Sequence, residues 1–455
     1  MNSIPHIGHL FEFILADSLT KYYRQNGRNV YFNTGIDEHG IKVYSKSIEL
    51  NIPIQEHLNN LNDIWIDFCK KFNIDYDNFY RTSSTEHHEK VKIIWNKFLE
   101  RGDIYKKDYV GKYCVGCESF KVDKEIVNNK CIDHTNLKLQ DVNEENYFFK
   151  LTKYKDILFN WIENTPEFLE PKSKLDELKN LITSSEDISI SRLKENCPWG
   201  VDVPGDNKHI IYVWFDALLN YIFAAGYLTD NFNWDNVIQL CGPDNLRFQA
   251  VIFQSFLESE GIKKSSKLLV HGTILDKDGK KISKSLGNTI DPIDQLEKYG
   301  VDAIKYYSLC GLSTCTNSNW NEEDLVRIWN SDICNDWGNL VSRTLHLIDT
   351  RLSGNTISPD SEFKKNVEQF ELNIKSLWDE FKIKDALQKT NELVKYANKY
   401  INDVKPWTIE NPNKELSNLY YLINIVNKLY LPVLPDSNDV IKTKKKSILY
   451  NKICA

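Results

Sequence analysis

Two histidines three residues apart, His6 and His9, stand at the start of a long amphipathic pattern. The apolar residues that follow at helical spacing are Leu10, Phe13, Ile14, Leu19, Tyr22 and Tyr23. The pattern predicts a helix with both imidazoles at its N-terminus, where backbone N–H groups and the helix dipole favour a bound polyphosphate. Gly8 lies between them and would let a flat base approach the backbone. Taken alone, the motif is explained more simply by two surface histidines that begin a helix.

A basic loop far along the chain, residues 280–288, reads Lys-Lys-Ile-Ser-Lys-Ser-Leu-Gly-Asn. Its lysines suit a loop that binds phosphates, because the ammonium group is a mobile point charge. A solvated surface loop is the usual explanation of such a run. The two motifs together, in this order and far apart, resemble the HIGH and KMSKS motifs of class I aminoacyl-tRNA synthetases, with Ile282 in place of the usual methionine.

The resemblance implies that ATP is a substrate and that Mg²⁺ accompanies its phosphates. His6, His9, Lys281 and Lys284 are then expected to be catalytic, stabilising the pentacoordinate phosphate and the departing pyrophosphate. The residues expected to bind ATP are Gly8, Gly242, Asp244, Lys281, Ser283, Lys284 and Ser285.

An aspartate near the start of the chain points to the amino acid. Residues 30–32 predict a buried strand that ends at Gly35, which places Asp37 just past a strand C-terminus, where open parallel sheets bind ligands. Capping of a helix is the simpler role for an aspartate there. However, the run TGIDEHG, residues 34–40, resembles methionyl-tRNA synthetases. The resemblance implies that Asp37 binds the α-amino group of the amino acid.

The resemblance continues in the run YVWFDALLNY, residues 212–221, which begins inside a strand predicted over residues 209–214. Trp214, Ala217 and Tyr221 would line an apolar slot for a thioether, since sulfur packs well against aromatic rings. Packing in the core is the alternative, and one residue can do both. Gln249 would also line the slot, although the family usually has a histidine there. Arg192, in an I-S-R stretch, would lie near the carboxylate of the amino acid, unless it is an ordinary surface arginine.

A strand is also predicted over residues 237–240. Gly242 and Asp244 follow it, at a strand end where a ribose could be held.

Four potential metal ligands have the spacing C-x2-C-x13-C-x2-H: Cys114, Cys117, Cys131 and His134. Two such pairs suit one tetrahedral, structural Zn²⁺. Free buried cysteines are the alternative, but packing does not explain the paired spacing. A zinc knuckle of this type occurs in methionyl enzymes, in the insertion between the two halves of the nucleotide-binding fold.

The expected fold is α/β, with a Rossmann-like parallel-sheet catalytic domain, an inserted zinc-knuckle connective domain and a C-terminal α-helical anticodon-binding bundle. Asn339 and Arg343, four apart on one helix face, and Trp407 would read anticodon bases by hydrogen bonding and stacking; Trp407 as a core residue is a serious competitor. The expected boundaries are 1–105 and 195–288 for the Rossmann halves, 106–194 for the insertion, 289–335 for a stem-contact region and 336–455 for the bundle.

Composition limits the location and the partners. The chain has 455 residues, a net charge of −7 and ten cysteines. The charge gives no global basic field, but local basic patches suffice for tRNA. We see no signal peptide and no apolar run of membrane-spanning length, so we expect no membrane partner and a reducing, cytoplasmic location. No dimerisation domain follows the bundle, which favours a monomer.

The expected activity is that of a methionine–tRNA ligase acting on methionine, ATP and tRNA(Met). One alternative is a related class I synthetase of different specificity, but residues 106–194 are few for a separate editing domain beside a knuckle. A synthetase-derived tRNA-binding protein without activity is the other. Only four residues precede Pro5, so we also expect the first strand of the sheet to be missing from the printed chain.

Overall fold

The computed structural model describes residues 4–114, 116, 119–121, 126–132, 138–282, 287–435, 441 and 449–454. Contacts within the chain divide it into two compact units. The first unit comprises residues 1–4, 31–68 and 76–270, and the second comprises 5–30, 69–75 and 271–455. Each unit is therefore built from segments that are far apart in the sequence. The five sequence-based boundaries remain predictions.

The first unit contains two groups of parallel strands. Strand β1 (Asn33–Ile36) pairs with β2 (Asn78–Arg81), and β13 (Lys267–Val270) lies between β12 (Ile238–Cys241) and β8 (Leu169–Glu170). Among the described residues, no strand joins the two groups by hydrogen bonds. The helices of this part of the chain are α2 (Ile41–Glu49), α3 (Ile54–Lys71), α4 (Thr85–Glu100), α5 (Lys155–Asn164), α6 (Leu175–Thr183), α7 (Val213–Ala224) and α8 (Phe253–Glu260).

The strand predicted over residues 30–32 is wrong, because the strand begins at Asn33. Tyr31 is 58% exposed, and the strand itself is formed by the polar and small residues Asn33, Thr34 and Gly35 before Ile36. Pairing with β2 fixes its position. A Cβ on Gly35 would stand 2.1 Å from the carbonyl oxygen of Tyr80, so only glycine permits this approach. Gly35 thus lies inside the strand and does not end it.

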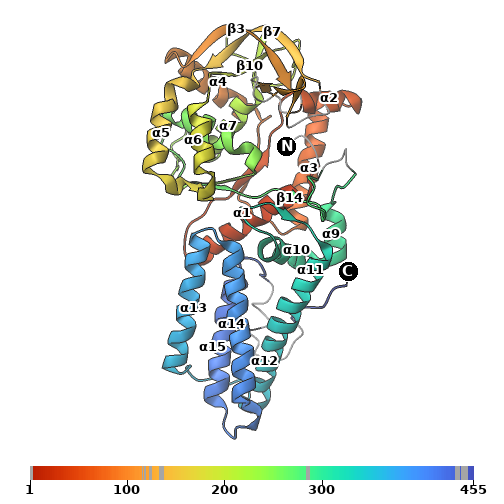
Figure 1. Cartoon of the computed structure of the whole chain (residues 1–455), viewed down its shortest axis with the longest axis vertical. Coiled ribbons are helices and arrows are strands. Elements are labelled where there is room, and N and C mark those ends of the chain that lie inside the picture. The colour runs from red at the N-terminus through yellow and green to blue at the C-terminus, as the bar shows by residue number, and fades with distance from the viewer. Residues whose placement is uncertain are drawn as a thin grey trace. The chain divides into compact units, whose positions relative to one another are not determined.

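Antiparallel strands make up another part of the first unit. The long strands β3 (Ile104–Cys114) and β7 (Gln140–Phe149) pair along their length, and Figure 1 shows them as adjacent arrows. The shorter strands are β4 (Ser119–Lys121), β5 (Ile126–Val127), β6 (Lys130–Cys131), β9 (Ile188–Ser189), β10 (Ser191–Leu193) and β11 (His209–Ile211). The strand predicted over 209–214 therefore ends three residues early, because Val213 already begins α7.

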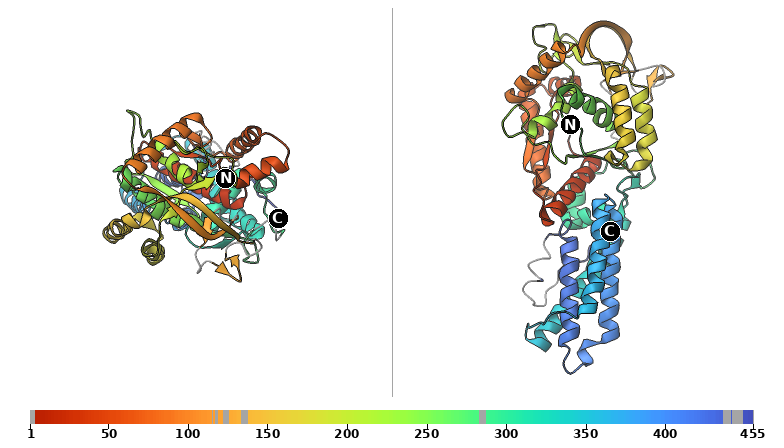
Figure 2. Two further views of the ribbon diagram at one scale, coloured as in Figure 1. Left: turned by 90° about the horizontal axis from the view of Figure 1, so that it is seen from above. Right: turned by 90° about the vertical axis from the view of Figure 1, so that its left-hand side faces the viewer.

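Helices dominate the second unit. The pattern at the start of the chain forms α1 (Ile7–Gln25), as predicted. Four long helices follow later, and both Figure 1 and the right-hand view of Figure 2 show α13, α14 and α15 side by side. They are α12 (Asn339–Leu352), α13 (Ser361–Asp379), α14 (Ile383–Val404) and α15 (Asn413–Tyr430). The shorter elements are β14 (Ile274–Leu275), α9 (Pro292–Tyr299), α10 (Val301–Tyr306), β15 (Ser318–Asn319) and α11 (Glu322–Ile328). None of the described helices is long and apolar enough to cross a membrane.

Candidate active site

The two histidines of the first motif stack on each other at the start of α1. His6 is the N-cap residue, and its Nδ1 accepts hydrogen bonds from the backbone N–H groups of Gly8 and His9, at 3.1 and 3.3 Å. Nδ1 of His9 accepts in return from the N–H of His6, at 3.3 Å, and the ring centroids are 3.6 Å apart. A Cβ on Gly8 would lie 3.1 Å from the His6 ring, so Gly8 leaves room for the stacked pair.

His9 and His271, both in the second unit, have opposite protonation tendencies. Burial lowers the pKa of His9 to about 2, with electrostatic repulsion between the two adjacent imidazoles as the second cause, so this imidazole is neutral at pH 7. Burial also opposes protonation of His271, but its hydrogen bond to the Glu12 carboxylate (2.8 Å) outweighs that effect and raises its pKa. The other ring nitrogen of His271 faces the carbonyl oxygen of Gly272, at 2.8 Å. A neutral and a readily protonated histidine therefore occur in the same unit.

Asp276 fixes both ends of the basic loop. One carboxylate oxygen accepts from the backbone N–H groups of Asp278 and Lys280, and the other accepts from the Asn288 side chain at 2.7 Å. The same amide group of Asn288 donates to the carbonyl oxygen of Lys281, at 3.2 Å. Lys281 is exposed, as expected of a lysine that contacts a substrate. The predicted residues Ser283, Lys284 and Ser285 lie outside the described residues.

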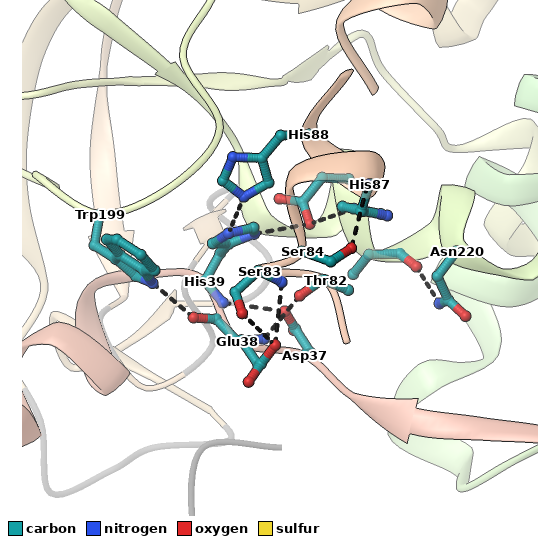
Figure 3. A network of polar contacts seen from close by, with 12 residues as sticks. Asp37, Glu38, His39, Thr82, Ser83, Ser84, His87, His88, Trp199 and Asn220 are labelled. Atoms are coloured by element: carbon teal, nitrogen blue, oxygen red, sulfur yellow. Dashed lines mark hydrogen bonds and ion pairs between the residues drawn. The ribbon is translucent and has the colours of Figure 1, made fainter. Parts of the chain in front are cut away.

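Asp37 follows β1 directly, as predicted, and is half-buried. Its position depends on Glu38, whose buried carboxylate accepts from the Arg81 guanidinium group at 2.7 and 3.0 Å and from the Ser83 backbone and hydroxyl at 3.1 and 2.7 Å. The Trp199 indole donates to the carbonyl oxygen of Glu38, at 2.7 Å (Figure 3). These bonds fix the turn after β1, and with it the backbone of Asp37.

A cluster of histidines around Asp216 was not predicted. Oδ1 of Asp216, on α7, lies 3.1 Å from Nδ1 of His39 and 3.4 Å from Nε2 of His87. Figure 3 shows the contact between His39 and His88, at 3.1 Å. Burial raises the pKa of Asp216 to about 6, against the opposing effect of His87. Burial lowers the pKa values of His39 and His88 to about 4. The signal in the sequence was a charged residue inside a mostly apolar helix.

The residues predicted for the thioether slot lie on one side of α7. Trp214, Ala217 and Tyr221 are three and four residues apart, which places them on one helix face. The Trp214 ring stacks on Phe248, with centroids 3.8 Å apart, an aromatic partner that the sequence did not identify. The Tyr221 hydroxyl accepts a hydrogen bond from the Gln249 amide, at 2.7 Å. The structure thus brings together Tyr221 and Gln249, two of the residues predicted to line the slot.

Arg192 is a buried residue of β10 and not an ordinary surface arginine. Its guanidinium group donates to the Ser189 hydroxyl at 3.0 Å and to the backbone carbonyl oxygen of Ser191. The same group lies 4.1 Å from the centroid of the Tyr212 ring. Arg192 also lines a small cavity to which Gly40, three residues after Asp37, contributes.

The turn after β12 carries Gly242 and Asp244. Asp244 is exposed at the C-terminal end of that parallel strand, the position predicted for a residue that binds the ribose.

Two of the four predicted metal ligands are described. Cys114 ends β3 and Cys131 ends β6, and both are fully buried. Cys117 and His134 lie outside the described residues. Within the described part of the chain, no three potential ligands gather around one point.

Of the predicted anticodon residues, Arg343 and Trp407 lie close together. The guanidinium carbon of Arg343, on α12, is 5.9 Å from the Trp407 ring centroid, and its Nη2 donates to the Asn402 side chain at 3.1 Å. Asn339 is exposed one turn earlier on the same helix. Trp407 is 42% exposed and is therefore not a core residue.

The family described as tRNA synthetases class I (M) matches residues 1–138 and 124–345, so the chain belongs to the class I tRNA synthetases, with the α/β fold of that class. The methionine–tRNA ligase of Caldanaerobacter subterraneus subsp. tengcongensis is 35% identical over 95% of this chain and 70% of its own length. That of Ureaplasma parvum is 34% identical over 94% of this chain and 87% of its own. Within the class, the chain belongs to the methionine–tRNA ligases.

A solved structure supports the same assignment. The methionyl-tRNA synthetase of Mycobacterium tuberculosis in complex with methionyl-adenylate has a TM-score of 0.90 at 30% identity. The match covers 97% of this chain and 91% of that one.

Proposed function

We propose that this chain activates methionine with ATP and transfers it to tRNA(Met). In the first step a carboxylate oxygen of methionine attacks the α-phosphorus of ATP, the bond to pyrophosphate breaks, and methionyl-adenylate forms. In the second step a hydroxyl of the terminal adenosine of tRNA displaces AMP. The observation that carries the proposal is the stacked His6–His9 pair at the N-terminus of α1. This pair belongs to the same unit as the basic loop.

The histidines and lysines stabilise charge and do not exchange protons in this scheme. His9 is neutral at pH 7, so it acts as a hydrogen-bond donor to phosphate oxygens through the ring nitrogen that does not cap the helix. His6 acts in the same way, and α1 adds the field of its N-terminus. Lys281 and Lys284 neutralise the departing pyrophosphate, together with Mg²⁺ carried by the nucleotide. Ser283 and Ser285 contribute hydroxyl groups to the same loop.

The amino acid is held by the first unit. Asp37 pairs with the ammonium group, and Arg192 binds the carboxylate. Trp214, Ala217, Tyr221 and Gln249 surround the thioether. Support comes from the fixed turn that carries Asp37 and from the bond between Tyr221 and Gln249. Asp244, with Gly242, holds the ribose of ATP, and Gly8 borders the nucleotide. Gln249 retains donor and acceptor groups, so methionine remains the preferred substrate despite the missing histidine ring.

A structural Zn²⁺ is part of the proposal, held by Cys114, Cys117, Cys131 and His134. The burial of Cys114 at the end of β3 and of Cys131 at the end of β6 suits thiolate ligands. The ion would supply folding energy to a segment of short strands.

The helical bundle binds the anticodon through Asn339, Arg343 and Trp407. An exposed tryptophan beside an arginine offers a stacking surface and a hydrogen-bond donor to a single-stranded base. We place the reaction in the cytoplasm, because ten cysteines suit a reducing compartment. The monomeric state remains a prediction.

ATP–pyrophosphate exchange with a panel of amino acids tests the activity and its specificity. We expect methionine alone to support rapid exchange. Lys284→Ala should slow exchange at saturating methionine strongly and leave methionine binding nearly intact, because its charge acts when pyrophosphate leaves. Lys280→Ala, in the same basic run, is the matched control and should retain exchange. Better exchange with leucine or isoleucine would overturn the specificity, and no exchange at all would favour the inactive tRNA-binding alternative.

A further inference from the structure

Three buried glutamines form a hydrogen-bonded chain behind the predicted amino-acid pocket. Gln249 donates to the Tyr221 hydroxyl at 2.7 Å and accepts from Gln239 at 2.7 Å. Gln239 accepts in turn from Gln254, at 3.3 Å. The exposed fraction is 4% for Gln249, 7% for Gln239 and zero for Gln254. Three amides in a row inside a protein core need partners for every polar atom, because an unpaired buried group is costly.

The far end of the chain fixes the orientation of all three amides. The backbone N–H of Ser265 can only donate, so the oxygen of Gln254 must face it, at 3.1 Å. The backbone carbonyl oxygen of Gln249 can only accept a hydrogen bond, so the side-chain nitrogen of Gln254 must face it, at 3.0 Å. The Gln254 nitrogen also contacts the Ser265 hydroxyl, at 3.2 Å. Because two amide N–H groups cannot face each other, Gln239 must turn its oxygen toward the Gln254 nitrogen, which leaves the nitrogen of Gln239 for the side-chain oxygen of Gln249. The nitrogen of Gln249 is thereby directed at Tyr221.

We propose that Gln239 and Gln254 are positioning residues of the amino-acid pocket, which hold the Gln249 amide with its N–H toward Tyr221. This inference rests on the proposed function, in which Tyr221 and Gln249 contact the side chain of methionine. In the fixed orientation the Tyr221 oxygen accepts from Gln249, so its hydrogen is directed away from the amide. The thioether sulfur is a weak acceptor. A hydroxyl with that orientation can donate to the sulfur, whereas a reversed amide would take the hydrogen of Tyr221 for itself.

Gln239→Glu reverses the polarity with almost no change of shape. The introduced carboxylate has no hydrogen for the Gln249 oxygen and accepts from its nitrogen instead, so the Gln249 amide turns over. We expect the KM for methionine in pyrophosphate exchange to rise about threefold to tenfold at pH 8, the range for one lost hydrogen bond. The kcat should change little, because the affected contact is made in both the ground state and the transition state.

The pH dependence of the KM in Gln239→Glu distinguishes a reoriented Gln249 amide from a general disturbance of the core. As pH falls and the introduced carboxyl takes up a proton, it again has a hydrogen to donate to Gln249, so the KM should return toward the wild-type value. Gln239→Met fills the same space without polar atoms and should raise the KM at every pH. An unaltered KM in Gln239→Glu, or the same pH profile in both variants, would overturn the proposal.

A double-mutant cycle tests whether Gln239 acts through Gln249. In a Gln249→Met background, Gln239→Glu should change the KM for methionine by less than about twofold, because there is no amide left to orient. An undiminished effect in that background would refute the proposed route. If Gln239→Glu does not fold, Gln254→Met, which removes the anchor to Ser265, provides the same comparison. Wild-type protein without methionine-dependent exchange would contradict the proposed function, whereas an active wild type with unaffected variants would contradict this inference alone.

Discussion

His6 occupies a position that helices usually give to serine, threonine, aspartate or asparagine. Its imidazole accepts from two backbone N–H groups at the start of α1, with Nε2 on the opposite side of the ring. Capping therefore fixes the tautomer of His6, because Nδ1 must be unprotonated to accept these bonds and the proton must be on Nε2. The same bonds that begin the helix thus prepare a hydrogen-bond donor for a phosphate.

The two roles of His6 can be separated by substitution. His6→Asn keeps a side chain that caps helices well, whereas His6→Ala does not. We expect His6→Ala to lose ~0.5–2 kcal/mol of stability and His6→Asn to lose much less. Both variants should lose ~10²–10³-fold in the rate of methionine-dependent exchange, the usual effect of removing one donor to a developing charge. Urea unfolding and exchange assays would measure this, and full activity in His6→Asn would show that His6 only caps the helix.

Single residues were predictable where the signal is local. The helix start at His6, the position of Asp37 after a strand and the common face of Trp214, Ala217 and Tyr221 all follow from residues close in sequence. Phe248 and Gln239 were missed because their contacts with Trp214 and Gln249 depend on how α7, β12 and the helical segment Phe248–Ile252 pack. Periodicity identifies which face of an element is buried but not which residue of another element meets it.

At the scale of elements, the cluster around Asp216 ties the turn after β1 to α4 and α7. Its groups are His39, His87, His88 and Asp216, and the charged residues around them include Asp37, Glu38, Glu89, Lys92 and Asp202. The pKa values of His39 and His88 are lowered to about 4, so the unfolded chain binds protons between pH 6.5 and 4 that the folded chain does not. The free energy of unfolding therefore falls as pH falls through this range. Asp216, with its pKa raised to about 6, opposes the effect in part.

His88→Gln isolates one member of this cluster, because an amide can still bond to His39 but does not titrate. We expect the free energy of unfolding to fall less steeply in the variant between pH 6.5 and 4.5, by up to ~1.4 kcal/mol per pH unit, the value for one proton. Urea unfolding at a series of pH values measures the difference. The two proteins should be similar in stability at pH 7.5. Parallel pH profiles would contradict the assignment of a lowered pKa to His88.

The segment between α14 and α15 carries Trp407 and allows a test of anticodon binding. Trp407→Ala should weaken tRNA charging, since base stacking contributes ~1–3 kcal/mol per base, and should leave ATP–pyrophosphate exchange unchanged. Trp407→Phe retains an aromatic ring and should recover most of the charging activity. Equal losses in both assays would mean that the substitution disturbs the fold and not the binding of tRNA.

Strands were predicted less well than helices, for a physical reason. β1 contains two polar residues and a glycine, and it is a strand because its backbone pairs with β2, 45 residues away in sequence. The long helices α1 and α13 to α15 carry enough repeats of their apolar stripe to be recognised without their partners. Backbone pairing between distant segments leaves no such repeat in the sequence.

For the molecule as a whole, the proposed Zn²⁺ should contribute to stability. We expect about one Zn²⁺ per chain by elemental analysis, and Cys114→Ser with Cys131→Ser should lose the metal and melt at a lower temperature. Cys454→Ser is the matched control, because Cys454 is exposed and lies outside the predicted ligand set. Metal-free protein with an unchanged melting profile would rule out a structural zinc site.

The segments of the two units alternate along the sequence, and this order determines when each part of a unit is synthesised. Helix α1 packs inside the second unit, where the buried Lys305 bonds to Asp17 and the carbonyl oxygen of Lys375 accepts from Tyr22. The ribosome finishes α1 at residue 25, but the rest of that unit begins only at residue 271, apart from residues 69–75. At ~5–20 residues per second, the apolar face of α1 is without these partners for at least ~10–50 s, the time needed to reach residue 271. We therefore expect the nascent helix to expose apolar side chains that chaperones can bind during that interval.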